Sequence, residues 1–114
     1  MTEENNLKRI MENLRSSYYT AQLLHEAATD RSILSGEYAW ICGQLETILQ
    51  RKPAIWNTLR GNVKSDTAAE RAWEQTSDGL NEAGLRIRLK SVEKMMQGLG
   101  SILKMAEGES RNNF

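Results

Sequence analysis

The sequence is poor in residues that punctuate or cross-link a chain, since its 114 residues include one proline, one cysteine and one histidine. The lone cysteine, Cys42, excludes an internal disulfide and a cysteine-based metal site, and it favours a reducing, cytoplasmic setting. The lone histidine, His25, has no second histidine or patterned cysteine with which to form a catalytic pair or a metal site. We therefore expect no enzyme activity, no cofactor and no metal.

Net charge and long apolar runs are lacking as well. Lys and Arg number 15, as do Asp and Glu, so the formal net charge is zero. A protein that coats nucleic acid needs an excess of bases to displace counterions from the phosphates. No apolar run approaches the roughly 20 residues that a bilayer requires. The composition thus excludes a uniformly basic coat and a membrane span, but it leaves local charged patches open.

The scarcity of proline and of clustered β-branched and aromatic residues predicts an all-α fold. Two apolar stripes at helical spacing, the second of which includes Ile41, Leu45 and Ile48, predict helices at about residues 3–28 and 32–51, with Asp30 or Ser32 placed to cap the second one. A connection this short predicts an antiparallel helical hairpin. Gly36 and Gly43 weaken the second helix, so we expect close backbone packing to be the reason for them.

The remaining chain predicts a short helix and a long one. Pro53 suits the first turn of a new helix, so residues 53–60 are expected to form a short helical segment. Capping residue types around Asp66 predict a helix start there, and no strong breaker follows for about 30 residues. A helix over 66–107 would be roughly 60 Å long. We expect one helical domain over residues 1–107 and a disordered tail at 108–114.

The apolar pattern of that long helix changes phase midway. One series includes Trp73, Leu80 and Ile87, and a second runs from Leu85 to Ala106, on faces roughly 160° apart on a straight helix. Either the helix breaks near Gly79 or Gly84 and folds back, or it stays straight and packs its halves on different partners. Neither glycine has a proline or a turn cluster beside it, which favours the straight helix. A straight helix in turn predicts a bundle or a coiled-coil-like oligomer, most simply a dimer.

Charge is segregated along this segment. Residues 65–85 carry a net charge of minus 4, residues 86–104 carry plus 4, and residues 51–64 hold four bases and no acid. The acids form a row with four-residue spacing, on one face of a helix: Asp66, Glu70, Glu74, Asp78 and Glu82. The helix dipole favours acids in the first turn only. An antiparallel dimer that sets the acidic half against the basic half, or a basic partner groove, would offset the repulsion within the row.

Bases and a tryptophan offer a second candidate surface. Trp56 lies in the basic connecting segment, and aromatic side chains among bases can stack on single-stranded nucleic acid. The candidate contacts to nucleic acid or a protein partner are Arg51, Lys52, Trp56, Arg60, Lys64, Arg86, Arg88, Lys90 and Lys94. Packing of Trp56 into the hydrophobic core is the structural alternative.

The segment Lys64-Ser65-Asp66 followed by Ala69-Glu70-Arg71 and Trp73-Glu74 gives the pattern K-S-D-x-x-A-E-R-x-W-E. Together with residues from Trp56 to Lys94, it resembles small all-helical proteins encoded in the early, recombination-module regions of bacteriophages and prophages. The resemblance covers about residues 53–104. It implies a phage protein in the cytoplasm of an infected bacterium.

These observations predict a non-enzymatic phage accessory protein that binds another protein, from the host or the phage. The expected effect is to modulate or inhibit a host nuclease, a defence complex or a recombination enzyme. The alternative is a single-strand nucleic-acid-binding factor in phage recombination. Steep weakening of nucleic-acid binding with salt would mark the alternative.

Overall fold

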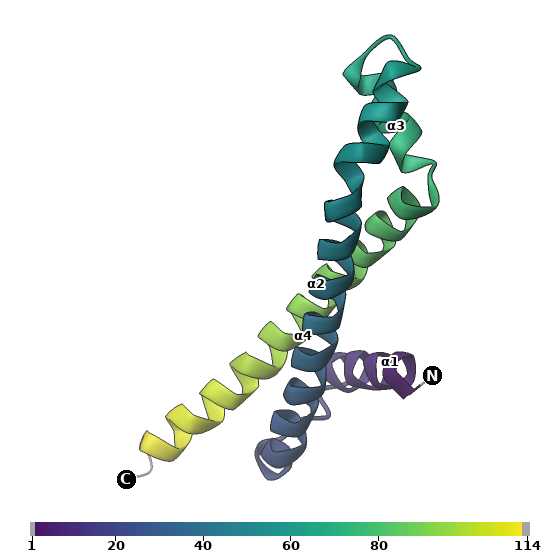
Figure 1. The fold of residues 1–114 in the computed structure, drawn as a ribbon. Helices are drawn as coiled ribbons and strands as arrows, with labels where there is room; N and C mark the ends of the chain where they lie inside the picture. Colours follow the sequence, from purple (N-terminus) through teal and green to yellow (C-terminus); the bar gives the residue numbers. More distant parts are fainter. Residues whose placement is uncertain (1, 113–114) are drawn as a thin grey trace. The chain divides into compact units, whose positions relative to one another are not determined.

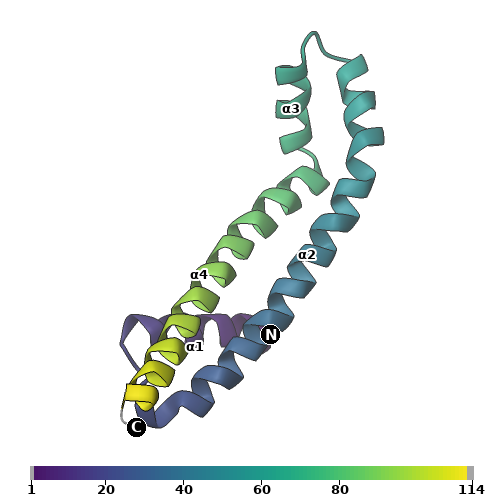
Figure 2. The same ribbon diagram turned by 90° about the vertical axis from the view of Figure 1, so that its left-hand side faces the viewer.

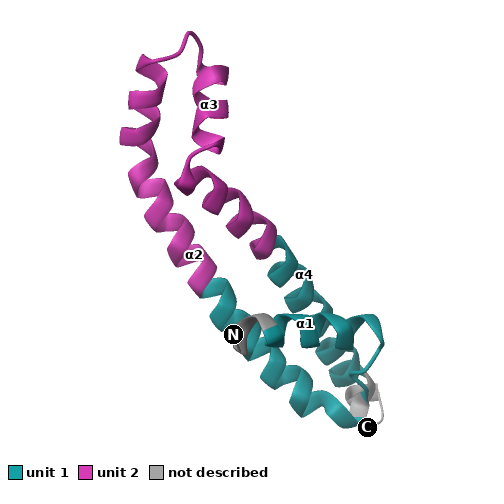
Figure 3. Cartoon of the chain, turned by 90° about the vertical axis from the view of Figure 1, so that its right-hand side faces the viewer, with its two compact units in different colours: residues 1–39, 90–114 teal, residues 40–89 magenta. Residues whose placement is uncertain are grey.

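A computed structural model describes residues 2–112, with side chains for 5–20 and 22–108. The described residues are helical and contain no strand, which confirms the all-α prediction. The elements are α1 (Thr2–Arg15), the short 3-10 turn η1 (Ala21–Leu23), α2 (Leu24–Gly61), α3 (Asp66–Glu74) and α4 (Ser77–Asn112) (Figure 1). They form two compact units, coloured in Figure 3: unit 1 is Met1–Ala39 with Lys90–Phe114, and unit 2 is Trp40–Leu89.

The first helix ends at Arg15, so the prediction of a helix over 3–28 is wrong. Ser17 takes a left-handed conformation with φ of 57°. The amide of Tyr18 donates to the Asn13 carbonyl at 2.9 Å, and the amide of Ser17 donates to the Leu14 carbonyl at 3.4 Å. This pair of hydrogen bonds is a Schellman C-cap, in which glycine is the usual left-handed residue. Because serine occupies that position, the sequence gives no strong signal for the end of α1.

The turn expected near Asp30 does not exist, because α2 runs through residues 28–32 without a break. Asp30 is only 4% exposed and caps nothing. Both of its carboxylate oxygens accept hydrogen bonds from the Arg9 guanidinium of α1, at 2.7 and 2.9 Å, and Oδ2 also accepts from the Tyr19 hydroxyl at 2.7 Å. Asp30 therefore attaches α1 and the following loop to α2 within unit 1.

The contacts among Arg9, Asp30 and Tyr19 shift the pKa values of Asp30 and Tyr19. Hydrogen bonds from Arg9 lower the pKa of Asp30 against the opposing effect of burial, with a further contribution from Tyr19. Burial raises the pKa of Tyr19 to about 12. The hydrogen bond with Asn13 acts to lower this pKa, and the hydrogen bond to Asp30 acts to raise it. Since the pKa of Tyr19 is higher in the folded state, its contribution to stability is complete below pH 10 and is lost as the pH rises through 12.

We expect one tyrosine to ionise near pH 12 in an absorbance titration of the folded protein, and this signal to be absent from Tyr19→Phe. The free energy of unfolding in urea should fall more between pH 10 and 12 for the wild-type protein than for Tyr19→Phe, because only the wild type has the shifted hydroxyl of Tyr19. Equal falls in the two proteins would contradict the assignment. Tyr18→Phe is the comparison variant: the hydrogen bond to Glu26 raises the pKa of Tyr18 as well, but the signal of Tyr19 near pH 12 should remain when Tyr18 is replaced.

Pro53 lies inside α2, so the prediction of a separate helix over 53–60 is wrong. A proline in a helix interior removes one backbone hydrogen bond and costs about 3 kcal/mol. Residues on both sides of it contact the rest of unit 2: Arg51 bonds Asp78, and Arg60 bonds Asp66. These contacts keep the helix continuous despite the proline.

The segment predicted as one straight helix over 66–107 is two helices. α3 begins at Asp66, as predicted, with the Ser65 hydroxyl accepting from the Ala68 amide at 3.1 Å. It ends at Glu74, and α4 begins at Ser77. α4 then continues to Asn112, so residues 108–112 of the expected disordered tail are helical. The single glycine at 108 does not end the helix. Residues 113 and 114 of the expected tail lie outside the described residues.

The core of each unit follows the predicted apolar stripes in part. Ile41, Leu45 and Ile48 of α2 are buried in unit 2, as expected. In unit 1 the buried side chains include Ile10, Leu34, Val92 and Leu99. Gly36 and Gly43 have open space where a Cβ would lie, so the expected close backbone packing is absent among the described residues.

Candidate interaction surface

Four of the five acids in the row form ion pairs with side chains of α2, within unit 2. Within this unit, the C-terminal part of α2 runs beside α3 and the first turns of α4 (Figures 2 and 3). Three acids receive hydrogen bonds from cations of α2: Asp66 from Arg60 at 2.7 Å, Glu70 from Lys52 at 3.3 Å and Asp78 from Arg51 at 2.9 Å. The bases of residues 51–60 thus offset most of the repulsion within the row, with no second chain required.

Glu82 completes the row at a buried position, 8% exposed. It accepts from the Trp73 indole N–H at 2.8 Å and from the Arg86 guanidinium at 2.9 Å, and the Lys52 ammonium lies 3.7 Å away. Burial opposes ionisation, but the bonds from Trp73 and Arg86 and the charge of Lys52 lower the pKa of Glu82 below its ordinary value. The Lys52 ammonium also lies 5.1 Å from the centre of the Trp73 ring. These four side chains hold α2, α3 and α4 together inside unit 2.

Glu74 is the exception in the acidic row. It is exposed, and it forms no ion pair with any described residue. Its neighbours in the row, Glu70 and Asp78, are both engaged by α2. Of the five acids predicted to bind a partner, only Glu74 presents an unshared carboxylate within the described part of the chain.

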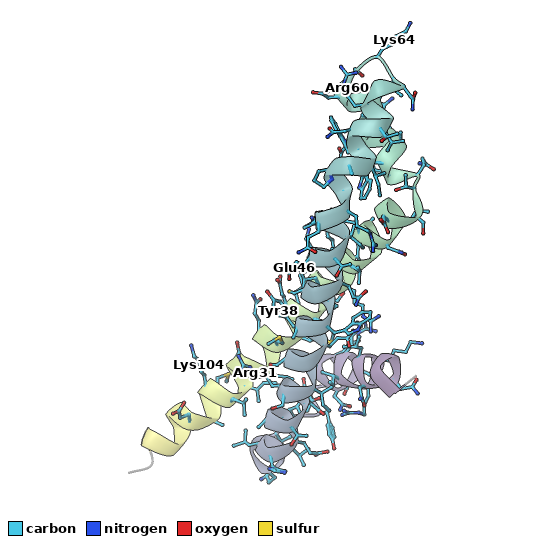
Figure 4. All side chains as sticks on the ribbon, in the orientation of Figure 1. Arg31, Tyr38, Glu46, Arg60, Lys64 and Lys104 are labelled. Carbon is cyan, nitrogen blue, oxygen red and sulfur yellow. The ribbon has the colours of Figure 1, made fainter. Side chains whose placement is uncertain are left out.

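The predicted basic and aromatic set is divided. Trp56 donates its indole N–H to Glu70 at 2.8 Å and is half-buried, so its polar edge faces α3. Arg51, Lys52 and Arg60 bond the acidic row, as described above. Arg86 bonds Glu82, and the guanidinium of Arg88 lies 5.7 Å from the centre of the Trp40 ring. Lys64 is exposed in the loop before α3 (Figure 4), and Lys90 and Lys94 are exposed on α4 in unit 1. The set is therefore divided between the two units, and in unit 2 most of its members are engaged by acids or by an aromatic ring.

The corner between α3 and α4 is tightly built. The Thr76 hydroxyl donates to the Trp73 carbonyl at 2.6 Å and accepts from the Gly79 amide at 3.0 Å, so Thr76 caps α4. A Cβ on Gly79 would lie 2.8 Å from the Trp73 carbonyl carbon and 3.1 Å from the Glu74 Cα, and closer still to the Trp73 carbonyl oxygen. Gly79 therefore allows α4 to start directly against the end of α3.

The break at this corner divides the apolar series that contains Trp73, Leu80 and Ile87. Trp73 is 1% exposed in the core, whereas Leu80 is 61% and Ile87 70% exposed on α4. The prediction that all three lie on one face of a continuous helix is wrong, because the helix is broken between Trp73 and Leu80. Trp40 of α2 is also exposed, at 46%.

These exposed residues form one surface of unit 2, here called the apolar surface and made of Trp40, Leu80, Ala83, Gly84 and Ile87. Trp40, Leu80 and Gly84 line a groove of about 480 Å³ between α2 and α4, with Gln44, Thr47 and Arg88 beside them. Large apolar side chains that stay in water mark binding surfaces when they adjoin one another. Sequence reasoning missed this surface because it treated Trp73, Leu80 and Ile87 as one stripe of an unbroken helix.

Unit 1 has a groove of its own, of about 650 Å³, between α2 and α4. Arg31, Tyr38 and Lys104 line it and are labelled in Figure 4. Glu93 and Met96 also contribute to its wall. Its lining mixes both signs of charge with apolar groups, and it contains none of the predicted site residues.

Among the described side chains, no three or more of His, Cys, Asp or Glu cluster closely enough to hold a metal ion. None of the described helices has a stretch long and apolar enough to traverse a bilayer. No protein-family model, curated protein or solved structure matches this chain.

Proposed function

We propose that the chain is a non-enzymatic phage accessory protein that acts by binding another protein in the bacterial cytoplasm. The observation that carries the proposal is the apolar surface of unit 2. Leu80 and Ile87 expose most of their area to water, although burying a side chain of this size stabilises a protein by about 1.5–3 kcal/mol. A protein partner that covers this surface gains that stabilisation.

The partner proposed is a host nuclease, a defence complex or a recombination enzyme, whose activity the chain modulates or inhibits. Support for this setting comes from the resemblance of residues 53–104 to early-region phage proteins. The exposed carboxylate of Glu74 adds a polar contact for a basic partner surface.

Affinity capture from a bacterial lysate tests the proposal. The wild-type chain should retain a protein that the double variant Leu80→Glu, Ile87→Glu does not, because each glutamate places a charge in an apolar interface. Leu49→Glu is the matched control: Leu49 is also exposed, at 42%, but it does not line the groove. The retained protein is then purified and titrated with the chain. Capture that is unchanged in the double variant, or no capture by the wild type, would refute the proposal.

Single-strand nucleic-acid binding is the alternative from the sequence, and its residues are mostly engaged within unit 2. We expect no measurable binding of a single-stranded oligonucleotide at about 50 mM salt, where phosphate contacts are strong. Fluorescence anisotropy checks this. Binding that weakens steeply with salt and is reduced by Lys64→Ala would contradict the expectation, and it would favour the alternative function.

A further inference from the structure

We propose that the exposed face of α4 in unit 1 is a second binding site, and that its ligand is an acidic amphipathic helix of another protein. The surface, here called the lysine row, is made of Lys90, Lys94, Gln97, Ser101 and Lys104. The lysine row belongs to unit 1 and shares no residue with the apolar surface of unit 2, so it goes beyond the proposed function.

The lysine row occupies one face of α4. Its five members recur at steps of four and three residues, so they lie within about 40° on either side of one line along the helix. All five are exposed. From residue 90 to residue 104 the row rises about 21 Å, which is roughly four turns. It carries three positive charges and no Asp or Glu.

The three lysines of the row have no internal partner. None of them forms an ion pair or a side-chain hydrogen bond with another described residue. In unit 2, by contrast, Lys52, Arg60 and Arg86 all bond acids. The positive charge of the lysine row is therefore not neutralised within the described chain, and it attracts an anionic partner.

A further cation approaches one end of the row from α2. The Nε of Arg31 lies 3.7 Å from the position that a Cβ on Gly100 would take. Arg31 and Lys104 line the groove of unit 1 together (Figure 4), and Arg31 forms no ion pair with a described residue either. Among the residues that line this groove, Glu93 is the only acid, about 16 Å along α4 from Lys104. Two cations from different helices thus border one end of the groove.

The groove beside the row favours a protein ligand over a nucleic acid. Met96 and Leu103 make part of its wall apolar, which suits an aliphatic side chain but not a phosphodiester backbone. The row has no aromatic side chain on which a base could stack. Its three lysines could neutralise only about three phosphates, so the affinity gained from released counterions would be small.

A helix is the form of protein ligand that fits this geometry. Its residues repeat at the same three- and four-residue spacing as the lysine row, so a helix lying along α4 can place acids on the row over several turns. Its adjoining apolar face then enters the groove, as in other complexes of a helix with a groove.

A second copy of this chain is a poorer ligand than another protein. The described chain has one row of acids at helical spacing, and within it Asp66 and Glu70 are bonded by Arg60 and Lys52. Binding to the lysine row of another copy would require those bonds to break. Only Glu74 could bind without such a loss.

Fluorescence anisotropy with a labelled peptide tests the site on the full chain. The probe is a helical peptide of about 20 residues made of Glu, Leu and Ala, with Glu and Leu at three- and four-residue spacing on adjoining faces. The wild type should bind it at about 50 mM salt, where charge contacts are weakly screened. The triple variant Lys90→Gln, Lys94→Gln, Lys104→Gln should bind at least about tenfold more weakly, because three ion pairs are lost.

A second triple variant controls for net charge. Lys8→Gln, Lys64→Gln, Arg71→Gln removes the same charge from three exposed positions outside the row, and its affinity should stay within about twofold of the wild type. Both variants should keep the helical circular dichroism spectrum, since all six side chains are exposed. Replacing Leu by Ser in the probe should weaken its binding to the wild type, because the groove then has no apolar side chain to take.

Four results would overturn the proposal. The first is no binding of the peptide by the wild type, and the second is equal weakening in the two triple variants. The third is tighter binding of a single-stranded oligonucleotide through the same lysines, which would assign the row to nucleic acid. The fourth is self-association in light scattering that the row variant abolishes, which would assign the row to a second copy.

Discussion

Trp73→Ala is expected to remove about 3–5 kcal/mol from the free energy of unfolding, the range found when a buried large aromatic is truncated. Trp73 is 1% exposed, and its indole N–H bonds the buried carboxylate of Glu82. The variant therefore loses packing and also removes a donor from Glu82, which leaves a buried charge less well solvated. Since domains of this size are stable by only about 5–15 kcal/mol, the variant should lose a large share of its stability.

Urea titration followed by circular dichroism measures this loss. Trp73→Phe separates the two contributions, because it keeps most of the packing and removes only the donor; its expected cost is about 1.5–3 kcal/mol. Leu49→Ala is the exposed control, with an expected change within about 0.5 kcal/mol. A loss below about 1 kcal/mol for Trp73→Ala would show that this tryptophan does not hold the three helices of unit 2 together.

Gly79→Ala should have the second large effect, a loss of about 1–3 kcal/mol or more. The new methyl group would collide with the backbone of Trp73 and Glu74, which cannot rotate aside as a flexible side chain can. The start of α4 must then move, and the cap from the Thr76 hydroxyl to the Gly79 amide is disturbed.

Gly36→Ala is the matched control, and the opposite sign is expected for it. Gly36 lies in the interior of α2 with nothing within 4 Å of its Cβ position, so alanine should stabilise the helix by about 0.5–1 kcal/mol. Urea midpoints of the two variants, measured against the wild type, check both signs. Stabilisation by Gly79→Ala would mean that the corner between α3 and α4 is looser than described.

Local patterns predicted part of this fold. The helix start at Asp66 follows from the capping residues, and the burial of Ile41, Leu45 and Ile48 follows from their spacing. The break at Gln75 and Thr76 could not be predicted in this way, because neither residue is a strong helix breaker. It depends on the Thr76 cap, a local contact that the sequence reasoning did not consider, and on Trp73 reaching Glu82, which is a tertiary contact.

The acidic row shows what sequence reasoning left out. Its spacing was identified, but its partners were sought in a second chain. The basic segment that immediately precedes it, with Arg51, Lys52 and Arg60, supplies the cations, because a hairpin loop brings neighbouring segments of opposite charge together. The opposite charges of residues 51–64 and of the acidic row that follows them could therefore have predicted these ion pairs. The exposure of Leu80 and Ile87 had no such signal, since it depends on the break.

Pro53 has one more consequence, for the order in which the protein opens. It has no N–H to offer the carbonyl of Leu49, so the hydrogen-bond ladder of α2 is interrupted between the buried Ile48 and the end of the helix. Beyond Pro53, the side-chain hydrogen bonds that join α2 to α3 come from Trp56 and Arg60, and both are accessible to water. Because Ala69 and Trp73 keep α3 in the core, we expect residues 54–65 to open locally before the rest of unit 2, with the remainder of α2 still helical. Such a segment would be the first part of unit 2 to exchange its amide hydrogens with solvent.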